Sequence, residues 1–236
     1  MHPSTLLLST LLALVATAAL PVTLSSGKVD TEPRVVPPTA VQEQPTDGPR
    51  AKRAPVGRHE IRWRRSVALG SPTAGRLVRG VRLPARGADF ATWDPNLHRT
   101  PNRAWRRWGT NRLVRLLLGI AREYRTAHPH ARPMLIGDLS RPHGGDFGRQ
   151  FGYVWHASHQ NGLDVDIYFP RTDRVRRAPR TAADIDRRLS QDLVDRFVRA
   201  GATDVFVGPG TGLNGPPGVV QVIPHHDDHM HVRIGP

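Results

Sequence analysis

The sequence contains no cysteine, and this absence removes several classes of protein and site at once. Disulfide bonds, cysteine-ligated metal centres, thiol nucleophiles and lipid attachment through cysteine are all excluded. An exported fold of this composition must be held together by the packing of its core and by any metal that it binds. A metal site in this chain has only nitrogen and oxygen ligands, for which its 12 histidines are the main source.

Lysine is nearly absent, because Lys28 and Lys52 are the only two, and the net charge of +14 therefore comes from arginine. A large positive charge is typical of proteins that meet polyanions. The arginines are scattered and no nucleic-acid-binding motif is present, so we expect no nucleic-acid partner. We expect an anionic cell-wall or membrane surface as the electrostatic partner.

Two familiar catalytic motifs are also missing. The sequence has no G-x-S-x-G, which disfavours a serine nucleophile, and no H-E-x-x-H, the helical zinc motif that carries a glutamate base. The only glutamate after Glu60 is Glu123, which falls in an expected helix. An acid–base group at a metal must therefore be a histidine or an aspartate.

The N-terminal part of the chain is apolar and is followed by a proline-rich stretch. The run LLLSTLLALVATAALPVTL is typical of an export signal, and we assign residues 1–25 to a signal peptide. An uncleaved membrane anchor is the alternative, because about 20 apolar residues span a bilayer. Residues 26–57 predict a disordered linker, since they hold few large apolar groups. One folded domain is expected over 58–236, exported to the periplasm, the cell wall or the extracellular space.

Apolar periodicity predicts two amphipathic helices in this domain. The first is expected to begin after Thr110, its N-cap, and to end before Pro129. The second is expected to begin near Thr181 and to stop at Gly201.

The β-rich parts of the domain are short. Residues 66–97 predict an irregular layer of turns and short strands. Five later runs are expected to be strands: 134–138, 163–169, 204–208, 219–223 and 230–234. The order of elements has no βαβ rhythm, which favours an α+β fold with a small antiparallel sheet flanked by helices.

Histidine and aspartate gather in the last third of the chain. The run SHQNGLDVDIYF carries His159 and Asp166, and the run PHHDDHMHVRIG carries four histidines, namely His225, His226, His229 and His231. Together the two runs make an H-x6-D followed by an H-x-H, which is typical of zinc ligands. Three such groups leave a coordination position for water, as in a hydrolytic site.

Strand periodicity places these groups on common faces. Asp164 and Asp166 lie two residues apart and share one face of their expected strand, as do His229 and His231 on the last strand. These pairs are either surface polarity or, where the two strands are neighbours, parts of one site.

The remaining histidines supply candidates for acid–base work. His229 lies two residues before the ligand candidate His231, and its ring titrates near neutrality, so it is the expected general base. His226 is expected to polarise a substrate carbonyl or to stabilise the oxyanion, with His225 as the alternative.

The motifs GDLS, the following GG, SHQNGLDVDI and the terminal H-x-x-H-x-H-V-R resemble the active-site region of the penicillin-insensitive murein endopeptidases. That family belongs to a wider group with lysostaphin-type enzymes, D-Ala-D-Ala metallopeptidases and the hedgehog signalling domain. The resemblance runs from about Ser66 to Arg233. It implies a fold like that of hedgehog and the D-Ala-D-Ala peptidases.

The resemblance also implies a set of functional residues. His159, Asp166 and His231 would bind one zinc ion per chain, and His226 and His229 would be catalytic. The implied reaction is hydrolysis of D-alanyl to diaminopimelyl cross-links between peptidoglycan stem peptides. Two alternatives stay open: a D,D-carboxypeptidase or dipeptidase of the same group, and a non-catalytic zinc-containing module that binds the wall.

The chain departs from the family in a longer loop before His159, which includes four aromatic residues: Phe147, Phe151, Tyr153 and Trp155. They either contact wall peptides or glycan, or they anchor the loop. His156 either lines the cleft or is a hydrogen-bonded surface histidine. Asp138 and Ser140 either orient ligands through hydrogen bonds or form a turn at a strand end.

Overall fold

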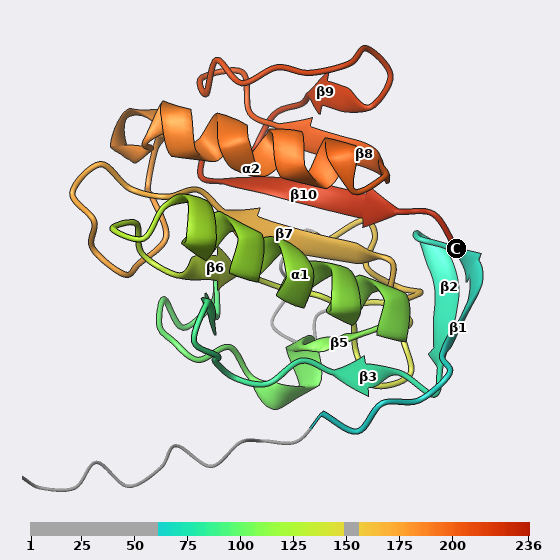
Figure 1. The fold of residues 1–236 in the computed structure, drawn as a ribbon. Coiled ribbons are helices and arrows are strands. Elements are labelled where there is room, and N and C mark those ends of the chain that lie inside the picture. The colour runs from blue at the N-terminus through green and yellow to red at the C-terminus, as the bar shows by residue number, and fades with distance from the viewer. Residues whose placement is uncertain (1–60, 149–155) are drawn as a thin grey trace, which may run out of the picture. The chain divides into compact units, whose positions relative to one another are not determined.

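A computed structural model describes residues 61–148 and 156–236 (Figure 1). The predicted signal peptide or anchor (1–25) and the predicted linker (26–57) lie outside the described residues, as do Phe151, Tyr153 and Trp155. Among the described residues, no helix is both long and apolar enough to span a bilayer.

The centre of the fold is a six-stranded sheet in the order β4-β6-β7-β10-β8-β9. Its strands are β4 (Phe90–Thr92), β6 (Met134–Ile136), β7 (Asp164–Tyr168), β8 (Ala202–Val207), β9 (Val220–Val222) and β10 (His229–Ile234). The four inner strands pair antiparallel, whereas β4 with β6 and β8 with β9 are parallel.

This mixed sheet with two helices fits the predicted α+β class, but the sheet is not wholly antiparallel. Parallel neighbours need a long crossover between them. The connection from β4 to β6 contains the first helix, and a twelve-residue loop over 208–219 connects β8 to β9. The pattern of single strands does not contain this information about their connections.

Two small pairs complete the strands. β1 (Val67–Ser71) and β2 (Ala74–Val78) form a hairpin, and β3 (Val81–Arg82) pairs with β5 (Trp108–Gly109). The layer over 66–97 therefore has the predicted form of turns and short strands, and in addition it contributes β4 to the central sheet.

Helix α1 (Asn111–Ala127) has the predicted boundaries and cap. The Thr110 hydroxyl accepts a hydrogen bond from the backbone N–H of Leu113 at 3.2 Å, which satisfies one free donor of the first turn. The apolar stripe is buried, with Leu113, Leu117 and Ile120 at most 3% exposed. The helix ends before Pro129, which was expected beyond its end.

Helix α2 (Arg187–Arg199) begins later than predicted. Thr181 opens a separate short 3-10 helix, and the Asp184 carboxylate accepts a hydrogen bond from the backbone N–H of Thr181 at 3.3 Å. Extended backbone at Ile185 (ψ 142°) breaks this turn from α2, whose true N-cap is Asp186. Thr181 is a residue type that often caps helices, but it caps the short 3-10 helix and not α2.

Both helices cover the same face of the central sheet (Figure 1). Val165 and Ile167 of β7 face them and are fully buried in the core. The alternate residues Asp164 and Asp166 lie on the other face, and they are also buried, at 0% and 3% exposed. Burial of two carboxylates excludes the surface-polarity alternative, since buried charges require partners.

Gly144 of the GG pair allows two backbone segments to approach closely. It has a left-handed φ of +72°, and a Cβ atom there would lie 2.0 Å from the carbonyl oxygen of Gln160. The next residue, Gly145, donates its N–H to the same carbonyl at 2.8 Å. This contact fixes the segment that carries His159.

We expect Gly144→Ala to lower the free energy of unfolding by at least about 1 kcal/mol, because alanine is strained at positive φ and its Cβ would overlap the backbone. Gly119 is the matched control, since it lies in α1 and a Cβ there would meet no atom within 4 Å. Gly119→Ala should raise stability by about 0.5–1 kcal/mol. Urea denaturation measures both changes, and equal effects of the two substitutions would contradict the close-approach argument.

Candidate functional site

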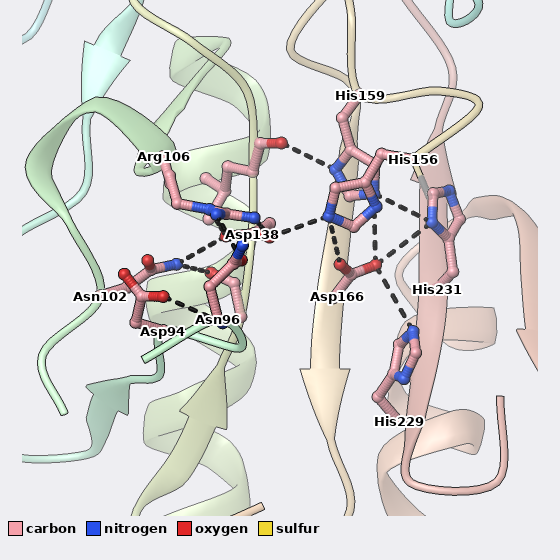
Figure 2. A network of polar contacts seen from close by, with 12 residues as sticks. Asp94, Asn96, Asn102, Arg106, Asp138, His156, His159, Asp166, His229 and His231 are labelled. Atoms are coloured by element: carbon pink, nitrogen blue, oxygen red, sulfur yellow. Dashed lines mark hydrogen bonds and ion pairs between the residues drawn. The ribbon is translucent and has the colours of Figure 1, made fainter. Parts of the chain in front are cut away.

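The pairing of β7 with β10 brings the two histidine–aspartate clusters together. The strands are neighbours, and their register places His231 opposite Asp166, His229 opposite Tyr168 and Arg233 opposite Asp164. Residues far apart in the sequence therefore share one buried face of the sheet (Figure 2).

Three potential ligand atoms meet at this face. The His159 Nε2 atom lies 3.1 Å from His231 Nδ1 and 3.2 Å from Asp166 Oδ1, and His231 Nδ1 lies 3.2 Å from the same carboxylate oxygen. Ligand atoms of a tetrahedral zinc site with bonds of about 2.0–2.1 Å are separated by about 3.3 Å. The triangle of donors thus has the dimensions that a tetrahedral ion requires.

Hydrogen bonds on the far side of each ring turn lone pairs toward this triangle. His159 Nδ1 lies 2.7 Å from the Leu139 carbonyl oxygen, which only accepts, so the proton is on Nδ1. His231 Nε2 lies 3.2 Å from Asp164 Oδ1 and donates to it in the same way. Such partners are typical of metal-bound histidines, whose tautomer they fix.

The third atom of the triangle has no hydrogen bond of its own. Asp166 Oδ1 is buried and has no hydrogen-bond partner among the described residues. A buried carboxylate oxygen facing two imidazole lone pairs is unfavourable unless a cation lies between them. The residues present therefore fit a divalent metal ion.

The backbone at His159 is held in an uncommon conformation. Its φ is +69°, in the left-handed region that non-glycine residues rarely adopt, and its N–H donates to Asp164 Oδ2 at 3.0 Å. The side chain is fully buried. Asp164 therefore contacts the backbone of one potential ligand and the ring of another.

The electrostatics of the two aspartates favour a cation. Burial opposes ionisation of Asp164, but the His231 hydrogen bond, His159 and Arg233 outweigh it and lower its pKa to about 2. Burial likewise opposes ionisation of Asp166, and the neighbouring imidazoles hold its pKa well below the usual range. Burial also opposes charge on His231, but the two carboxylates raise its pKa to about 9. The carboxylates that favour a proton here also favour a metal ion, which needs the neutral imidazole.

His156 is a fourth neighbour of the triangle. Its potential ligand atom and those of His159 and Asp166 all lie within 4.8 Å of one another, so this group could also hold an ion. Its Nε2 atom lies 2.8 Å from Asp138 Oδ2 and 3.6 Å from Asp166 Oδ2. While it donates to Asp138 it offers no lone pair from Nε2, which favours His231 as the third ligand. His156 lines the cleft and is half-buried.

Asp138 anchors a second buried network beside the triangle (Figure 2). Arg106 donates to both of its oxygens at 2.6 and 2.5 Å, and Asn102 donates to Oδ1 at 2.8 Å. Burial opposes ionisation of Asp138, but His156 and Arg106 outweigh it and lower its pKa. Arg106 and Asp138 side chains are both 0% exposed, so loss of one partner would strand the other charge at a cost of about 3–5 kcal/mol.

Among the described residues, the Asp138 side chain makes no hydrogen bond to a residue of the triangle, but the backbone carbonyls of Asp138 and Leu139 do. The Asp138 carbonyl accepts the backbone N–H of Asp166 at 2.9 Å, and the Leu139 carbonyl accepts from His159. The Ser140 hydroxyl has no hydrogen-bond partner in the described part of the chain. Phe147 is 2% exposed and packs edge-on against His156 and His159, so this aromatic residue anchors its segment.

His229 and Asp228 form a pair at the edge of the triangle. His229 Nδ1 lies 2.6 Å from Asp228 Oδ1, and its Nε2 lies 4.0 Å from Asp166 Oδ1. Burial lowers the pKa of this ring, but Asp228 and Asp166 outweigh burial and raise it above its ordinary value. The carboxylate holds one ring nitrogen, and the other faces the potential metal ligands.

His226 lies beside His229, with 4.8 Å between the ring centroids. Its Nδ1 atom donates to the Pro224 carbonyl at 2.8 Å, so Nε2 can donate to an oxyanion only when the ring is protonated. Burial lowers the pKa of His226, which works against that form. His225 is exposed and also lines the cleft.

These groups open into a cleft of about 920 Å³. Histidines 156, 225, 226, 229 and 231 line it, together with Asp166, Tyr168, Phe206 and Arg233. A cleft of this size lies within the range of pockets that bind a ligand.

Sequence reasoning gave no role to four residues that the structure places around the site: Asn102, Arg106, Asp164 and Asp228. For two of them, the sequence contains a pattern that points to the site. Asp164 shares a strand face with Asp166, and Asp228 directly precedes His229. Asn102 and Arg106 have no such pattern, because they lie more than fifty residues before His159 and reach the site only through the fold.

This chain is similar in sequence to a known family of proteins. A family model described as penicillin-insensitive murein endopeptidase matches residues 68–203, more than half of the chain. Two proteins of that name, from Escherichia coli O157:H7 and its strain EC4115, are each 43% identical to this chain over 63 residues. The aligned stretch is 27% of this chain and 20% of each relative's length. The family match contains His159 and Asp166 but ends before His231, whose place opposite Asp166 comes from the geometry. The chain belongs to the penicillin-insensitive murein endopeptidase family.

Proposed function

We propose that this chain is an exported zinc metallopeptidase that hydrolyses D-alanyl to diaminopimelyl cross-links in peptidoglycan. Membership of a murein endopeptidase family supports peptidoglycan as the substrate. The observation that carries the metal is the convergence of His159 Nε2, His231 Nδ1 and the unpartnered Asp166 Oδ1.

These three residues would hold the ion, and the donor set of two imidazoles and one carboxylate suits zinc. When bound, zinc would supply activation of a water molecule and polarisation of the substrate carbonyl. Asp164 and the Leu139 carbonyl keep the two rings in the tautomers that ligation needs.

His229 is the proposed general base. Asp228 accepts a hydrogen bond from Nδ1–H, which leaves Nε2 to take a proton from the attacking water and to deliver it to the departing amine. The raised pKa of His229 suits this second step, since a more basic ring holds the proton until the amine needs it. His226, beside it in the cleft, is proposed to support the developing oxyanion in its protonated form.

The organisation of the whole chain completes the proposal. Residues 1–25 would direct export or anchor the chain, 26–57 would form a flexible spacer, and 58–236 would be the catalytic domain. Such a layout would place the domain outside the cytoplasm with reach into the wall.

Metal analysis tests the ligand set. We expect about one zinc ion per purified chain, and we expect both metal and hydrolysis to be lost on chelation and in His231→Ala. His98→Ala is the matched control, because His98 is exposed and lies outside the cleft. Elemental analysis and a peptidoglycan digestion assay measure the two properties. Full zinc occupancy in His231→Ala would overturn the assignment of this ligand.

Substitution of the proposed base should separate catalysis from metal binding. We expect His229→Ala to keep its zinc and to lose about 10²–10⁴-fold in kcat, the usual contribution of a general base. Asp228→Asn should lose less, because the ring remains but its orientation and basicity change. Steady-state kinetics on a soluble cross-linked muropeptide, with metal content measured in parallel, provide the readout. A His229→Ala protein with wild-type kcat would exclude this role.

The products identify the bond that is cut. We expect dimeric muropeptides to be converted to monomers whose stem peptides keep their lengths, as separated by liquid chromatography and mass spectrometry. Shortened stems in intact dimers would show a D,D-carboxypeptidase or dipeptidase instead. Binding of dimers by a zinc-loaded protein without any hydrolysis would favour the non-catalytic wall-binding module.

A further inference from the structure

A second cavity, of about 380 Å³, lies away from the potential metal ligands. Its walls are the loop over 127–133 after α1, the segment over 168–177 after β7 and the start of α2. Tyr168 lines both this cavity and the catalytic cleft, so the two are neighbours.

The lining of this cavity is strongly cationic. Its arginines come from all three walls: Arg132, Arg171, Arg174, Arg176, Arg177 and Arg188. Among the described residues that line it, the single carboxylate is Asp186, which caps α2 by accepting the N–H of Leu189. Five arginines fall in the ten residues 171–180, whereas lysine and arginine together are 34 of 236 in the chain. The concentration is therefore local and exceeds the general arginine content.

One of these arginines is already paired and buried. Arg171, 8% exposed, donates to Asp173 at 2.8 and 2.6 Å and forms an ion pair with Asp184 at 3.2 Å. Its Nη1 atom is the one that makes this ion pair, and it is buried with no further hydrogen bond among the described residues. The cavity lining thus includes a guanidinium that two carboxylates hold in place.

The arginines at the mouth are different. Arg174, Arg176, Arg177 and Arg188 are exposed, and across residues 61–148 and 156–236 no hydrogen bond or ion pair holds their guanidinium groups. Arg132 donates from Nε to the Arg174 carbonyl at 2.6 Å, and it forms no ion pair among the described residues. Like charges crowded around one opening repel one another unless an anion joins them.

The number of these arginines, and the fact that they come from different segments, indicate the chemistry of that anion. A carboxylate offers two oxygens in one plane and suits a single guanidinium fork, whereas a phosphate presents oxygens in several directions and can join arginines from different segments. The charge at the mouth also exceeds what one phosphate neutralises. An anion with successive phosphate groups matches both features.

We propose that this cavity is a binding site for a phosphodiester-linked anionic polymer. The site follows from the cavity alone, and only the choice of a wall polymer as its natural source rests on the proposed function. Because Tyr168 borders both cavities, a polymer held here would keep the catalytic cleft close to its substrate in the wall.

The test compares two triple variants of the full chain with equal changes in charge. The first changes Arg174, Arg176 and Arg177 to glutamate, and the second changes the exposed residues Arg64, Arg65 and Arg86, which lie outside this cavity, to glutamate. Isothermal titration calorimetry at constant ionic strength measures binding of a glycerol-phosphate oligomer and of poly-glutamate of similar charge. Hydrolysis of soluble muropeptide dimers is measured separately.

We expect the wild-type chain to bind the glycerol-phosphate oligomer at least tenfold more tightly than poly-glutamate, with affinity that falls as salt rises. The cavity variant should lose at least tenfold in affinity, and the control variant less than twofold. Muropeptide hydrolysis should be unchanged in both, so a failure of the peptidase proposal would be seen independently. Equal losses in the two variants, equal affinity for poly-glutamate, or no binding by the wild type would each overturn the proposal.

Discussion

The register of β10 against β7 is the constraint on which the site depends. With His231 opposite Asp166, one imidazole and one carboxylate are direct cross-strand neighbours on one face of the sheet. A slip of β10 by one residue would turn His231 into the helix-covered core, where Val165 and Val232 now lie. The apolar face of the same two strands prevents that slip, because it is fully buried. Core packing and ligand geometry are thus set by a single alignment.

A second layer of buried charge keeps this face in order. Asp164 holds the His231 ring and the His159 backbone, while Asp138 joins Arg106, Asn102 and His156. Such networks contribute little net stability, since desolvation offsets most of their attraction. These networks instead fix the positions of the side chains, because each group has one arrangement that satisfies its hydrogen-bond partners. The left-handed backbone of His159 persists because these contacts fix it from both sides.

How far the sequence predicts this molecule depends on the range of each interaction. The cap of α1 at Thr110 is local, and its prediction was correct; Thr181 has the same local signal, but Ile185 adopts extended backbone and the helix starts at Asp186. The shared face of Asp164 and Asp166 follows from strand periodicity. The contribution of Arg106 depends on contacts across more than thirty residues, and no periodicity records it. The parallel pairing of the two edge strands also depends on contacts between distant parts of the chain, so strand periodicity does not predict it.

The position of β10 in chain order has a further consequence for how the protein is made. This strand lies between β7 and β8 in the interior of the sheet, yet every other strand and helix precedes it in the sequence. During synthesis the sheet stays split, and the face that carries Asp166 lacks its opposite strand, until residue 234 has emerged from the ribosome. The three potential ligands can therefore come together only late in folding, after β10 has joined the sheet.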